Sequence, residues 1–367
     1  MLENTLYLAA KHVMFDQLEK LGHQIISVYE EDLQPFVTGD HNISNCPPNW
    51  KKTHDHLAPE IAVLENCYLF PNGAVLTEDS LYIGREAVFT IDPWRKRHGS
   101  FIASEIAEDD SCHVIEPFSV VELSGTYFSC FCAHARNHGH FVHDVLSRVY
   151  YEELGAIEPG QVTLLTQPFL FPMQELMFNA VYGAFDRQTF DNTHTLKVER
   201  LLVPRNMCRS SAFNPRAIAA LRRRLASSDL IGNISGIAAE KVYISRRDGT
   251  KSSGGRDFVN HLEIEDLFKQ AGYLIAEVSK ITAPQQAGLW PGVKTIAGVH
   301  GAGLMNMIMC EDADYLELFG FPRGPDFTMR CAVAAGHRCH AVGGVAGDNA
   351  TVRLSEGDIR NFIEAAV

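Results

Sequence analysis

The stretch KTIAGVHGAGLMNMIMCEDADYLELF, residues Lys294–Phe319, decides how the rest of the chain is interpreted. It begins with a short apolar run, Thr295–Val299, which has the length and composition of a strand buried on both faces. A glycine turn follows, and Leu304–Met309 then has the apolar density of a buried helix. A second apolar run, Tyr315–Phe319, completes the pattern. Strand, glycine turn, helix and strand in this order predict a nucleotide-binding βαβ unit.

The glycine turn between the first strand and the helix is predicted to hold a phosphate group. Its residues are Gly301, Ala302, Gly303 and Leu304. Small residues allow the backbone to approach a phosphate closely, and the unpaired N–H groups at a helix start attract the anion. Asn306 stands where a dinucleotide-binding fingerprint has its third glycine, which weakens an NAD-binding interpretation. A structural tight turn without a ligand is the competing interpretation.

Length and composition limit the kinds of protein that the chain can be. Its 367 residues exceed what one hydrophobic core usually serves, so two domains are expected. The net charge of −13 argues against nucleic acid as a partner, and an anionic ligand would need a local basic site. The N-terminus lacks the apolar core of a signal peptide, and no apolar run is long enough for a transmembrane segment. Nine scattered cysteines without a CxxC pair indicate free thiols, so we expect a cytoplasmic protein.

From Lys241 onward, strands and helices alternate regularly. The predicted strands are Lys241–Ser245, Leu274–Val278, Thr295–Val299, Tyr315–Phe319 and Arg338–Val342, and the predicted helices are Leu262–Ala271, Ala283–Trp290, Leu304–Met309, Asp326–Ala335 and Ser355–Val367. Such alternation predicts a parallel, doubly wound α/β sheet. The first half mixes strands with helices, among them a helix over Asn137–Leu154, and the segment His41–Pro59 is predicted to be a loop.

The boundary between the two expected domains is placed between Phe190 and Asn214. We therefore expect an N-terminal domain at residues 1–205 and a C-terminal domain at residues 206–367. The last helix could also pack back on the N-terminal domain.

Basic residues follow the first strand of the predicted parallel sheet. Arg246 comes directly after this strand, at the sheet edge where open α/β sheets bind ligands, and we expect it to grip a phosphate. Lys251 and Arg256 lie in a glycine- and serine-rich loop that could close over the same ligand. Glu317 lies near the end of the strand after the glycine turn, where a carboxylate can bind ribose hydroxyls. His300 either contacts the ligand or is a hydrogen-bonded turn histidine, and both interpretations stay open.

The segment from His134 to Asp144 contains four histidines within ten residues and an aspartate. If a helix begins within it, His140 and Asp144 stand one turn apart on the same face. An aspartate that accepts from one ring nitrogen leaves the other nitrogen as a base, so the pair is a candidate for proton transfer. A metal site formed by His140, His143 and Asp144 is a competing interpretation, although no remote cysteine or acidic motif accompanies it. A helix cap at Asn137 with partly exposed histidines is the structural alternative.

The elements that carry a family resemblance are Asn137–Asp144, Ile244–Arg246, Arg256 with Asn260, Gln286, Gly298–Asn306 and Leu316–Leu318. In their order and spacing, over about residues 133–319, the chain resembles the family 61 glycosyltransferases. That family includes eukaryotic β-1,2-xylosyltransferases and protein O-GlcNAc-transferases, and many bacterial proteins assigned to capsular polysaccharide synthesis.

The resemblance implies a GT-B-like α/β architecture, in which two Rossmann-like, doubly wound domains face each other across a cleft. It also implies transfer of a sugar from a nucleotide sugar with inversion, without a cofactor or a metal ion. The expected catalytic residues are Asp144 and His140, acting as a pair, and the expected acceptor contacts are Asn137 and His143. The expected donor contacts are Arg246, Arg256, Asn260, Gln286, His300, Gly301, Ala302, Gly303, Leu304, Asn306 and Glu317.

The expected substrates follow from the same resemblance. The donor would be a nucleotide sugar, in the first place a UDP-sugar, and the acceptor a hydroxyl of a glycan or lipid-linked saccharide in bacterial surface polysaccharide synthesis. Such an enzyme would work in the cytoplasm, with peripheral association with the inner face of the membrane as an option. The alternatives are a nucleotide-sugar epimerase or hydrolase on the same fold, and a non-catalytic subunit that binds a nucleotide sugar.

Overall fold

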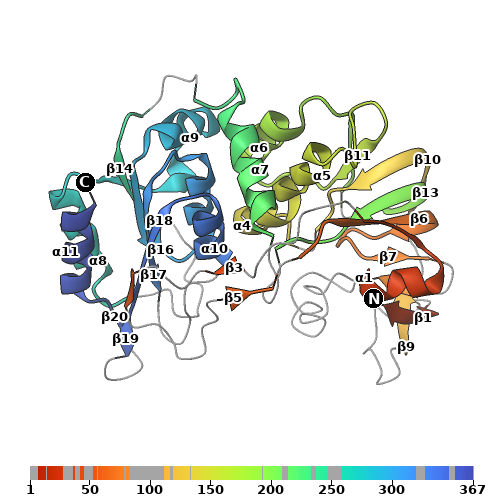
Figure 1. The fold of residues 1–367 in the computed structure, drawn as a ribbon, viewed down its shortest axis with the longest axis horizontal. Helices are drawn as coiled ribbons and strands as arrows, with labels where there is room; N and C mark the ends of the chain where they lie inside the picture. The colour runs from red at the N-terminus through yellow and green to blue at the C-terminus, as the bar shows by residue number, and fades with distance from the viewer. Residues whose placement is uncertain are drawn as a thin grey trace.

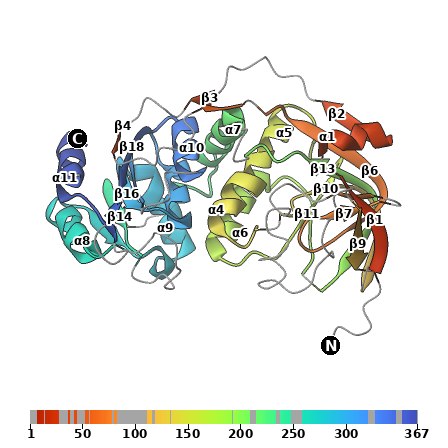
Figure 2. The ribbon, with the colours of Figure 1, turned by 90° about the horizontal axis from the view of Figure 1, so that it is seen from below.

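The computed structural model of the chain describes residues 7–13, 15–27, 36–37, 42–44, 53–55, 57–77, 80–82, 111–115, 119–132, 134–191, 193–208, 214–232, 237–246, 258–319, 327–346 and 352–366. In this part of the chain, two β-sheets enclose two layers of helices, and further helices cover the outer face of the C-terminal sheet (Figures 1 and 2). Within these ranges, none of the helices has both the length and the apolar character needed to cross a membrane.

The C-terminal sheet has six strands, all parallel, in the order β15-β14-β16-β17-β18-β4. They are β4 (Asn42–Ser44), β14 (Lys241–Ile244), β15 (Leu274–Ala276), β16 (Thr295–Val299), β17 (Asp314–Phe319) and β18 (Arg338–Gly343). The strands from β14 to β18 thus follow the spatial order 2-1-3-4-5, and the winding reverses between β14 and β16. Open α/β sheets bind ligands outside the carboxyl ends of the strands at such a reversal. The predicted parallel sheet is confirmed, and the edge where its winding reverses follows Ile244 and Val299.

Helices cover both faces of this sheet. On the outer face lie α8 (His261–Gln270) and α11 (Glu356–Ala365), and on the inner face lie α9 (Ala283–Leu289), the 3₁₀ helix η6 (Ala302–Met309) and α10 (Phe327–Ala334) (Figure 1). Two 3₁₀ turns, η4 (Val278–Lys280) and η5 (Trp290–Gly292), flank α9. Helix α11 buries Ile359 and Phe362 in one cluster with Phe268 of α8. The closing helix therefore packs on the C-terminal sheet, on the side away from the N-terminal half.

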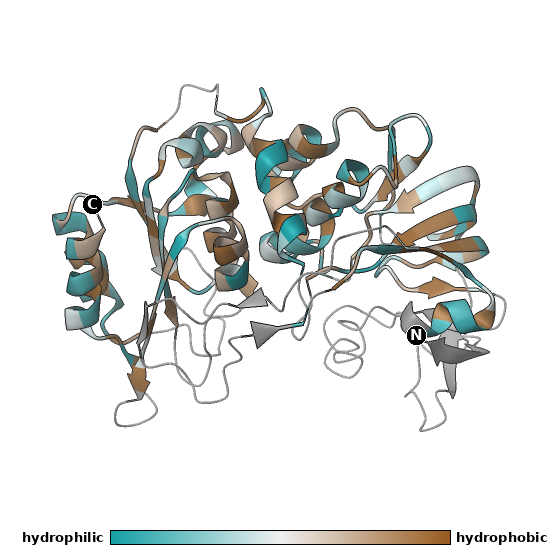
Figure 3. Cartoon of the chain, in the orientation of Figure 1, coloured by the Kyte–Doolittle hydropathy of each residue, from teal (hydrophilic) through white to brown (hydrophobic). Residues whose placement is uncertain are grey.

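The second layer of helices lies between α9 and α10 and the N-terminal sheet (Figure 2). It contains α6 (Pro172–Tyr182), α7 (Pro215–Ala226) and a helical run made of α4 (His138–His140), the π-helical turn η2 (Phe141–Val145), the 3₁₀ turn η3 (Leu146–Arg148) and α5 (Val149–Glu153). The predicted helix over Asn137–Leu154 is thus present, although its hydrogen-bond pattern changes along its length. Its side chains Phe141 and Leu146 share one buried core with Leu304 and Met329, where hydrophobic faces of the two helix layers meet (Figure 3). The core is therefore continuous from one half of the chain to the other.

The N-terminal sheet is mixed. Its strands follow the order β12-β11-β10-β13-β6-β7-β8-β1-β9, and β2 also pairs with β6. They are β1 (Tyr7–Val13), β2 (Gln24–Ser27), β6 (Glu60–Leu69), β7 (Val75–Leu76), β8 (Ser80–Tyr82), β9 (Ser111–Ile115), β10 (Val120–Ser129), β11 (Thr163–Thr166), β12 (Arg187–Thr189) and β13 (Thr195–Pro204). The pairs among β12, β11, β10 and β13 are parallel, but β13, β6, β7 and β8 pair antiparallel. A doubly wound, parallel sheet was expected here, and parallel pairing is present only among these four strands, because short turns such as Pro71–Gly73 can join only antiparallel strands.

The predicted loop over His41–Pro59 contains two short strands. Strand β4 pairs in parallel with β18, with Asn42 opposite His340. Strand β5 (Thr53–His54) pairs antiparallel with β3 (Phe36–Val37). The loop prediction is wrong at these positions, because strands this short are defined by partners elsewhere in the chain and not by a local pattern. The remaining short elements are α1 (Phe15–Leu18), η1 (Glu19–Leu21), β19 (Val345–Ala346) and β20 (Val352–Arg353).

Candidate active site

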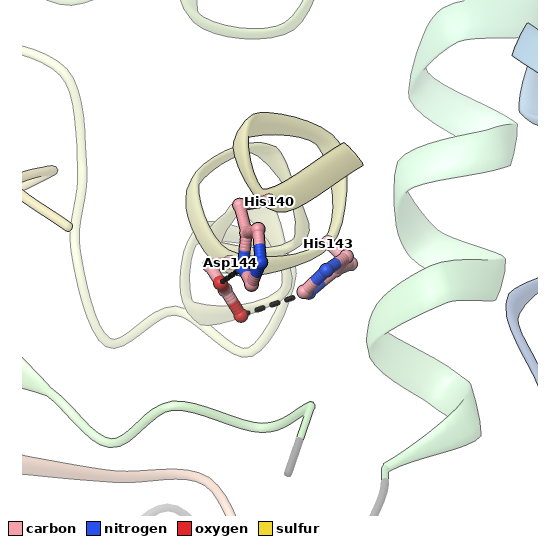
Figure 4. A group of neighbouring side chains, drawn as sticks. All are labelled: His140, His143 and Asp144. Atoms are coloured by element: carbon pink, nitrogen blue, oxygen red, sulfur yellow. Dashed lines mark hydrogen bonds and ion pairs between the residues drawn. The ribbon is translucent and has the colours of Figure 1, made fainter. Parts of the chain in front are cut away.

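Asp144 is the centre of a cluster of polar side chains on the π-helical turn η2, with a histidine ring at each carboxylate oxygen (Figure 4). Its Oδ2 accepts a hydrogen bond from His140 Nδ1, and its Oδ1 accepts one from His143 Nδ1, both at 2.8 Å. Asn206, shortly after β13, donates Nδ2 to Oδ1 at 2.9 Å, and Cys132 Sγ lies 3.6 Å from Oδ2. Side chains from three segments of the chain therefore fix this carboxylate.

The surroundings of Asp144 keep it ionised. Burial alone would raise its pKa, but the charges of His143 and His140 and their hydrogen bonds outweigh burial and hold the pKa well below its usual range. A carboxylate can only accept hydrogen bonds, so each ring donates its Nδ1–H and keeps Nε2 for another partner. Asp144 is therefore unsuited to take up a proton itself, and it fixes the tautomer of two rings that can.

Exposure distinguishes the two histidines. The side chain of His140 is 31% exposed, whereas those of His143 and Asp144 are 5% and 1% exposed. The ring of His143 is stacked on Phe327 with 4.8 Å between centroids, and the ring of His140 lies 4.8 Å from that of His134. Of the two histidines, His140 is therefore the one that a substrate hydroxyl can reach.

The start of the helical run explains why these side chains converge. Asn137 is its N-cap, and its Oδ1 accepts from the backbone N–H groups of Gly139 at 2.9 Å and His140 at 3.4 Å. The next turn is π-helical, a form that occurs mostly as single turns and often at functional sites. It carries His143 and Asp144 one turn after His140. The predicted cap and the predicted contact between His140 and Asp144 are both present.

A second cluster surrounds the glycine turn after β16. The guanidinium of Arg246, two residues after β14, donates to the backbone carbonyl oxygen of His300 at 2.9 Å. It lies so close to Gly301 that a Cβ at that position would overlap it. A Cβ at residue Gly303 would lie 3.3 Å from Cγ2 of Ile244. The absence of a side chain at both positions thus leaves room for the close approach of Arg246 and Ile244, and the predicted arginine reaches the predicted turn.

Glu317 lies on β17 beside this turn, and its side chain is 0% exposed. Its carboxylate accepts hydrogen bonds from Nδ1 of His300, from Thr328 Oγ1 at 2.9 Å and from the hydroxyl of Tyr315 at 3.0 Å. The contact of Glu317 with a ribose stays a prediction. What the structure shows is a second carboxylate–histidine pair, in which His300 is hydrogen-bonded, and the contact of His300 with a ligand stays a prediction.

The two clusters meet where α4 packs on η6. Nε2 of His138 lies 3.0 Å from Oδ1 of Asn306, which is fully buried. Gly139 faces Ala302 so closely that a Cβ on the glycine would lie 3.7 Å from Cβ of the alanine. The predicted donor turn of the C-terminal half and the predicted base segment of the N-terminal half are thus in direct contact.

The first residues of α10 connect the same two clusters. The ring of Phe327 is stacked on His143, with an angle of 3° between the ring planes, and the adjacent Thr328 donates to Glu317. Arg330 Cζ lies 4.1 Å from the centroid of the Phe327 ring. The sequence alone did not indicate Phe327 or Thr328 as site residues, because no local pattern links the start of a helix to side chains on other elements.

Other predicted donor contacts have different surroundings. The buried side-chain amide of Asn260 donates to the backbone carbonyl of Leu354 at 3.0 Å and accepts from its N–H at 3.1 Å. Gln286 donates Nε2 to two backbone carbonyl oxygens before α9. Arg256, like Lys251, lies outside the described residues. The structure thus uses Asn260 and Gln286 to hold backbone segments, and their contact with a donor stays a prediction.

His140, His143 and Asp144 could also hold a metal ion, because one potential ligand atom from each lies within 4.8 Å of the others. In the structure the three side chains are hydrogen-bonded to one another. Both carboxylate oxygens of Asp144 accept from ring nitrogens at 2.8 Å, so the group is satisfied as a set of hydrogen bonds.

Comparison with known protein families identifies the region that contains both clusters. Residues 138–315 match the glycosyltransferase 61 family, Glyco_transf_61. This region of the chain is a glycosyltransferase 61 domain. The protein is therefore an enzyme that transfers a sugar, and the resemblance found in its sequence is confirmed. The matched region of this glycosyltransferase contains His140, Asp144, Arg246 and His300, and it ends two residues before Glu317. Comparison with curated proteins gives no match.

Proposed function

We propose that this glycosyltransferase moves a sugar, with inversion, from a nucleotide sugar to a hydroxyl of a glycan or lipid-linked acceptor. The observation that carries the proposal is the contact between α4, which bears the exposed His140, and η6, which begins in the glycine turn. A base for the acceptor and a phosphate-binding turn for the donor then lie on two sides of one reaction centre. In the proposed GT-B arrangement, the N-terminal half supplies the base and the C-terminal half supplies the turn.

On the acceptor side, His140 takes the proton of the attacking hydroxyl through Nε2. Asp144 holds the ring through Nδ1 and stabilises the imidazolium that forms. The freed oxygen attacks C1 of the sugar from the face opposite the leaving nucleoside diphosphate, which inverts the anomeric configuration. Asn137 is exposed at the start of the helix and is proposed to contact the acceptor, whereas the buried His143 supports Asp144 from the inside.

On the donor side, Arg246 and the backbone N–H groups of Gly301–Leu304 are proposed to hold the diphosphate. A guanidinium and the start of a helix supply the positive potential that a leaving diphosphate needs. The structure fixes Arg246 against His300 and Gly301, at the edge where the winding of the sheet reverses. Because these groups can neutralise the leaving group, we expect a UDP-sugar to react in the presence of EDTA at an undiminished rate.

The proposed biological setting is the synthesis of a bacterial surface polysaccharide. Its support is the assignment of many bacterial members of the family to capsular polysaccharide synthesis. The enzyme would then work in the cytoplasm, at the inner face of the membrane, where a lipid-linked acceptor is accessible.

The test is a transfer assay with the full chain, a panel of UDP-, GDP- and dTDP-sugars, and glycan and lipid-linked acceptors. Release of nucleoside diphosphate that depends on an acceptor, together with an inverted product, would support the proposal. Donor consumption in acceptor-free buffer would instead indicate an epimerase or hydrolase. Binding of a nucleotide sugar without turnover would indicate a non-catalytic subunit.

A further inference from the structure

Glu317 is a fully buried carboxylate on β17, in the interior of the C-terminal sheet. It accepts hydrogen bonds from His300, Thr328 and Tyr315. Because all three partners donate, the side chain acts as an ionised acceptor. A buried carboxylate is strongly destabilising unless it is paired with a positive charge. Of its three partners only His300 can carry that charge, and its Nδ1 lies directly against the Glu317 carboxylate.

His300 is held in a defined position at the start of the glycine turn. Its backbone N–H donates to the carbonyl of Leu318 at 2.7 Å, and its own carbonyl accepts from Arg246 at 2.9 Å. Its side chain is 16% exposed, in contrast to the fully buried Glu317. Since Nδ1 is committed to Glu317, Nε2 is the ring nitrogen that remains for a ligand, and in a protonated ring it donates.

We propose that His300 is a catalytic residue whose Nε2–H donates to the phosphate oxygen that leaves the sugar. Glu317 is the residue that positions His300 and stabilises its charge, and Tyr315 and Thr328 hold Glu317 in place. The inference rests on the proposed transfer from a nucleotide sugar. In this proposal Glu317 does not contact the substrate directly. It acts on the reaction by positioning His300.

The transfer step balances with these residues. A bond forms between the acceptor oxygen and C1, while the bond between C1 and the phosphate oxygen breaks and its electron pair stays on the phosphate. The hydroxyl proton goes to His140. His300 keeps its proton and stabilises the new negative charge through a hydrogen bond that strengthens as the charge develops.

The experiment compares His300→Gln and Glu317→Gln with the wild type in steady-state transfer and in calorimetric binding of UDP and of inorganic pyrophosphate. Each variant should lower kcat by about 10²-fold, since the hydrogen bond acts mainly in the transition state. The Kd of UDP should change by less than about tenfold. Added imidazole should restore part of the kcat of His300→Ala, which a purely structural role of His300 would not allow.

A matched control is His337→Gln. His337 is another buried histidine of the C-terminal half, and its hydrogen bonds go to the backbone of Met307 and Ala313. Its loss should leave kcat unchanged. If His337→Gln lowers kcat as much as His300→Gln does, the effect is general damage to the domain and the inference is wrong.

Thr328→Val provides a test that does not require a change of charge. It removes one hydrogen bond to Glu317 and should lower kcat about three- to tenfold with an unchanged Kd of UDP. An unchanged kcat in both His300→Gln and Thr328→Val would overturn the inference. A wild type that neither binds nor releases a nucleoside diphosphate would instead contradict the proposed function, so the two failures can be told apart.

Discussion

Each half of the molecule places a buried carboxylate against the imidazole of a histidine, and the two pairs differ in what else touches the carboxylate. Asp144 accepts from two histidines and from Asn206. Glu317 accepts from one histidine and two hydroxyl groups. The side chain of His140 beside Asp144 is 31% exposed, and that of His300 beside Glu317 is 16% exposed.

This difference matches the opposite roles that we propose for His140 and His300. The Asp144 carboxylate is hydrogen-bonded to two rings, in the pair proposed to supply the base. The Glu317 carboxylate is hydrogen-bonded to a single ring, in the pair proposed to supply the donor. Active sites commonly assign acid and base roles by such environments. We therefore propose that the partners of each carboxylate, and not the pair itself, decide between base and donor.

The largest effect is expected from Asp144→Asn. An amide can accept from one ring but presents its NH₂ group to the other, so the tautomer of His140 is no longer fixed. We expect kcat/KM for transfer to fall about 10³-fold, within the usual range for a general base, while the Kd of UDP is unchanged. Steady-state release of nucleoside diphosphate measures the first quantity and calorimetry the second.

The control for this change is Asp191→Asn. Asp191 pairs with His194 at 2.9 Å, but both side chains are exposed. Removing this surface pair should leave transfer unaffected, since exposed pairs contribute little. A loss of less than tenfold in Asp144→Asn, or retained activity in both Asp144→Asn and His140→Gln, would contradict the base assignment.

The next largest effect is expected from Gly301→Ala, which disturbs the cluster around the glycine turn without changing the Glu317 carboxylate. In Gly301→Ala the new methyl group overlaps the guanidinium of Arg246 and displaces it from the turn. We expect kcat/KM to fall about 10²-fold, since small displacements of positioning groups have effects of this size, with most of the loss in the Kd of UDP. Gly292→Ala is the matched control, because a Cβ there meets open space. Equal UDP affinity in both variants would show that Arg246 does not hold the diphosphate.

The C-terminal cluster could largely be predicted from the sequence. The strand over Thr295–Val299 has the predicted bounds, and Arg246 and His300 follow neighbouring parallel strands. Alternating strands and helices leave few ways to connect a sheet, so the edge that collects ligand-binding residues follows from the order of the elements. Local periodicity was sufficient here because the connections are short and regular.

The other parts depend on contacts that periodicity does not encode. The contact of His140 with Asp144 was predicted because residues four apart face each other on a helix. The contact of His143 with Asp144 was not, because adjacent residues diverge in an α-helix and meet here only in a π-helical turn. The same holds for Thr328, which reaches Glu317 from a separate helix. Packing between distant segments sets these contacts.

His337 sharpens the comparison, because both of its hydrogen bonds go to backbone groups and not to a carboxylate. Burial lowers its pKa from 6.5 to about 4. Between these values the unfolded chain binds a proton that the folded chain does not, so stability falls as the pH drops from about 6.5 to 4. The expected loss from this group is about 3 kcal/mol. The free energy of unfolding, measured with urea across this pH range, should decline more steeply for the wild type than for His337→Gln. Parallel declines would contradict the lowered pKa of His337.

The smallest effect is expected from Phe327→Leu. The Phe327 ring is stacked on His143, which in turn bonds Asp144, so its loss loosens the base cluster without removing a polar group. A stacked pair of rings contributes about 0.5–1.5 kcal/mol, so kcat/KM should fall about three- to tenfold. Phe362→Leu is the control, because Phe362 packs edge-on against His340 on the outer side of the C-terminal sheet. It should lower Tm without changing transfer.

Phe327 also allows the separation of the two pairs to be tested, because its neighbour Thr328 bonds Glu317. If the pairs act independently, the losses in Phe327→Leu and Thr328→Val multiply in the double variant. We expect the double variant to lose less than that product, because one turn of α10 positions both clusters and its displacement by the first change already weakens the second contact. A purely multiplicative loss would show that base and donor are set separately, and that α10 does not couple the two clusters.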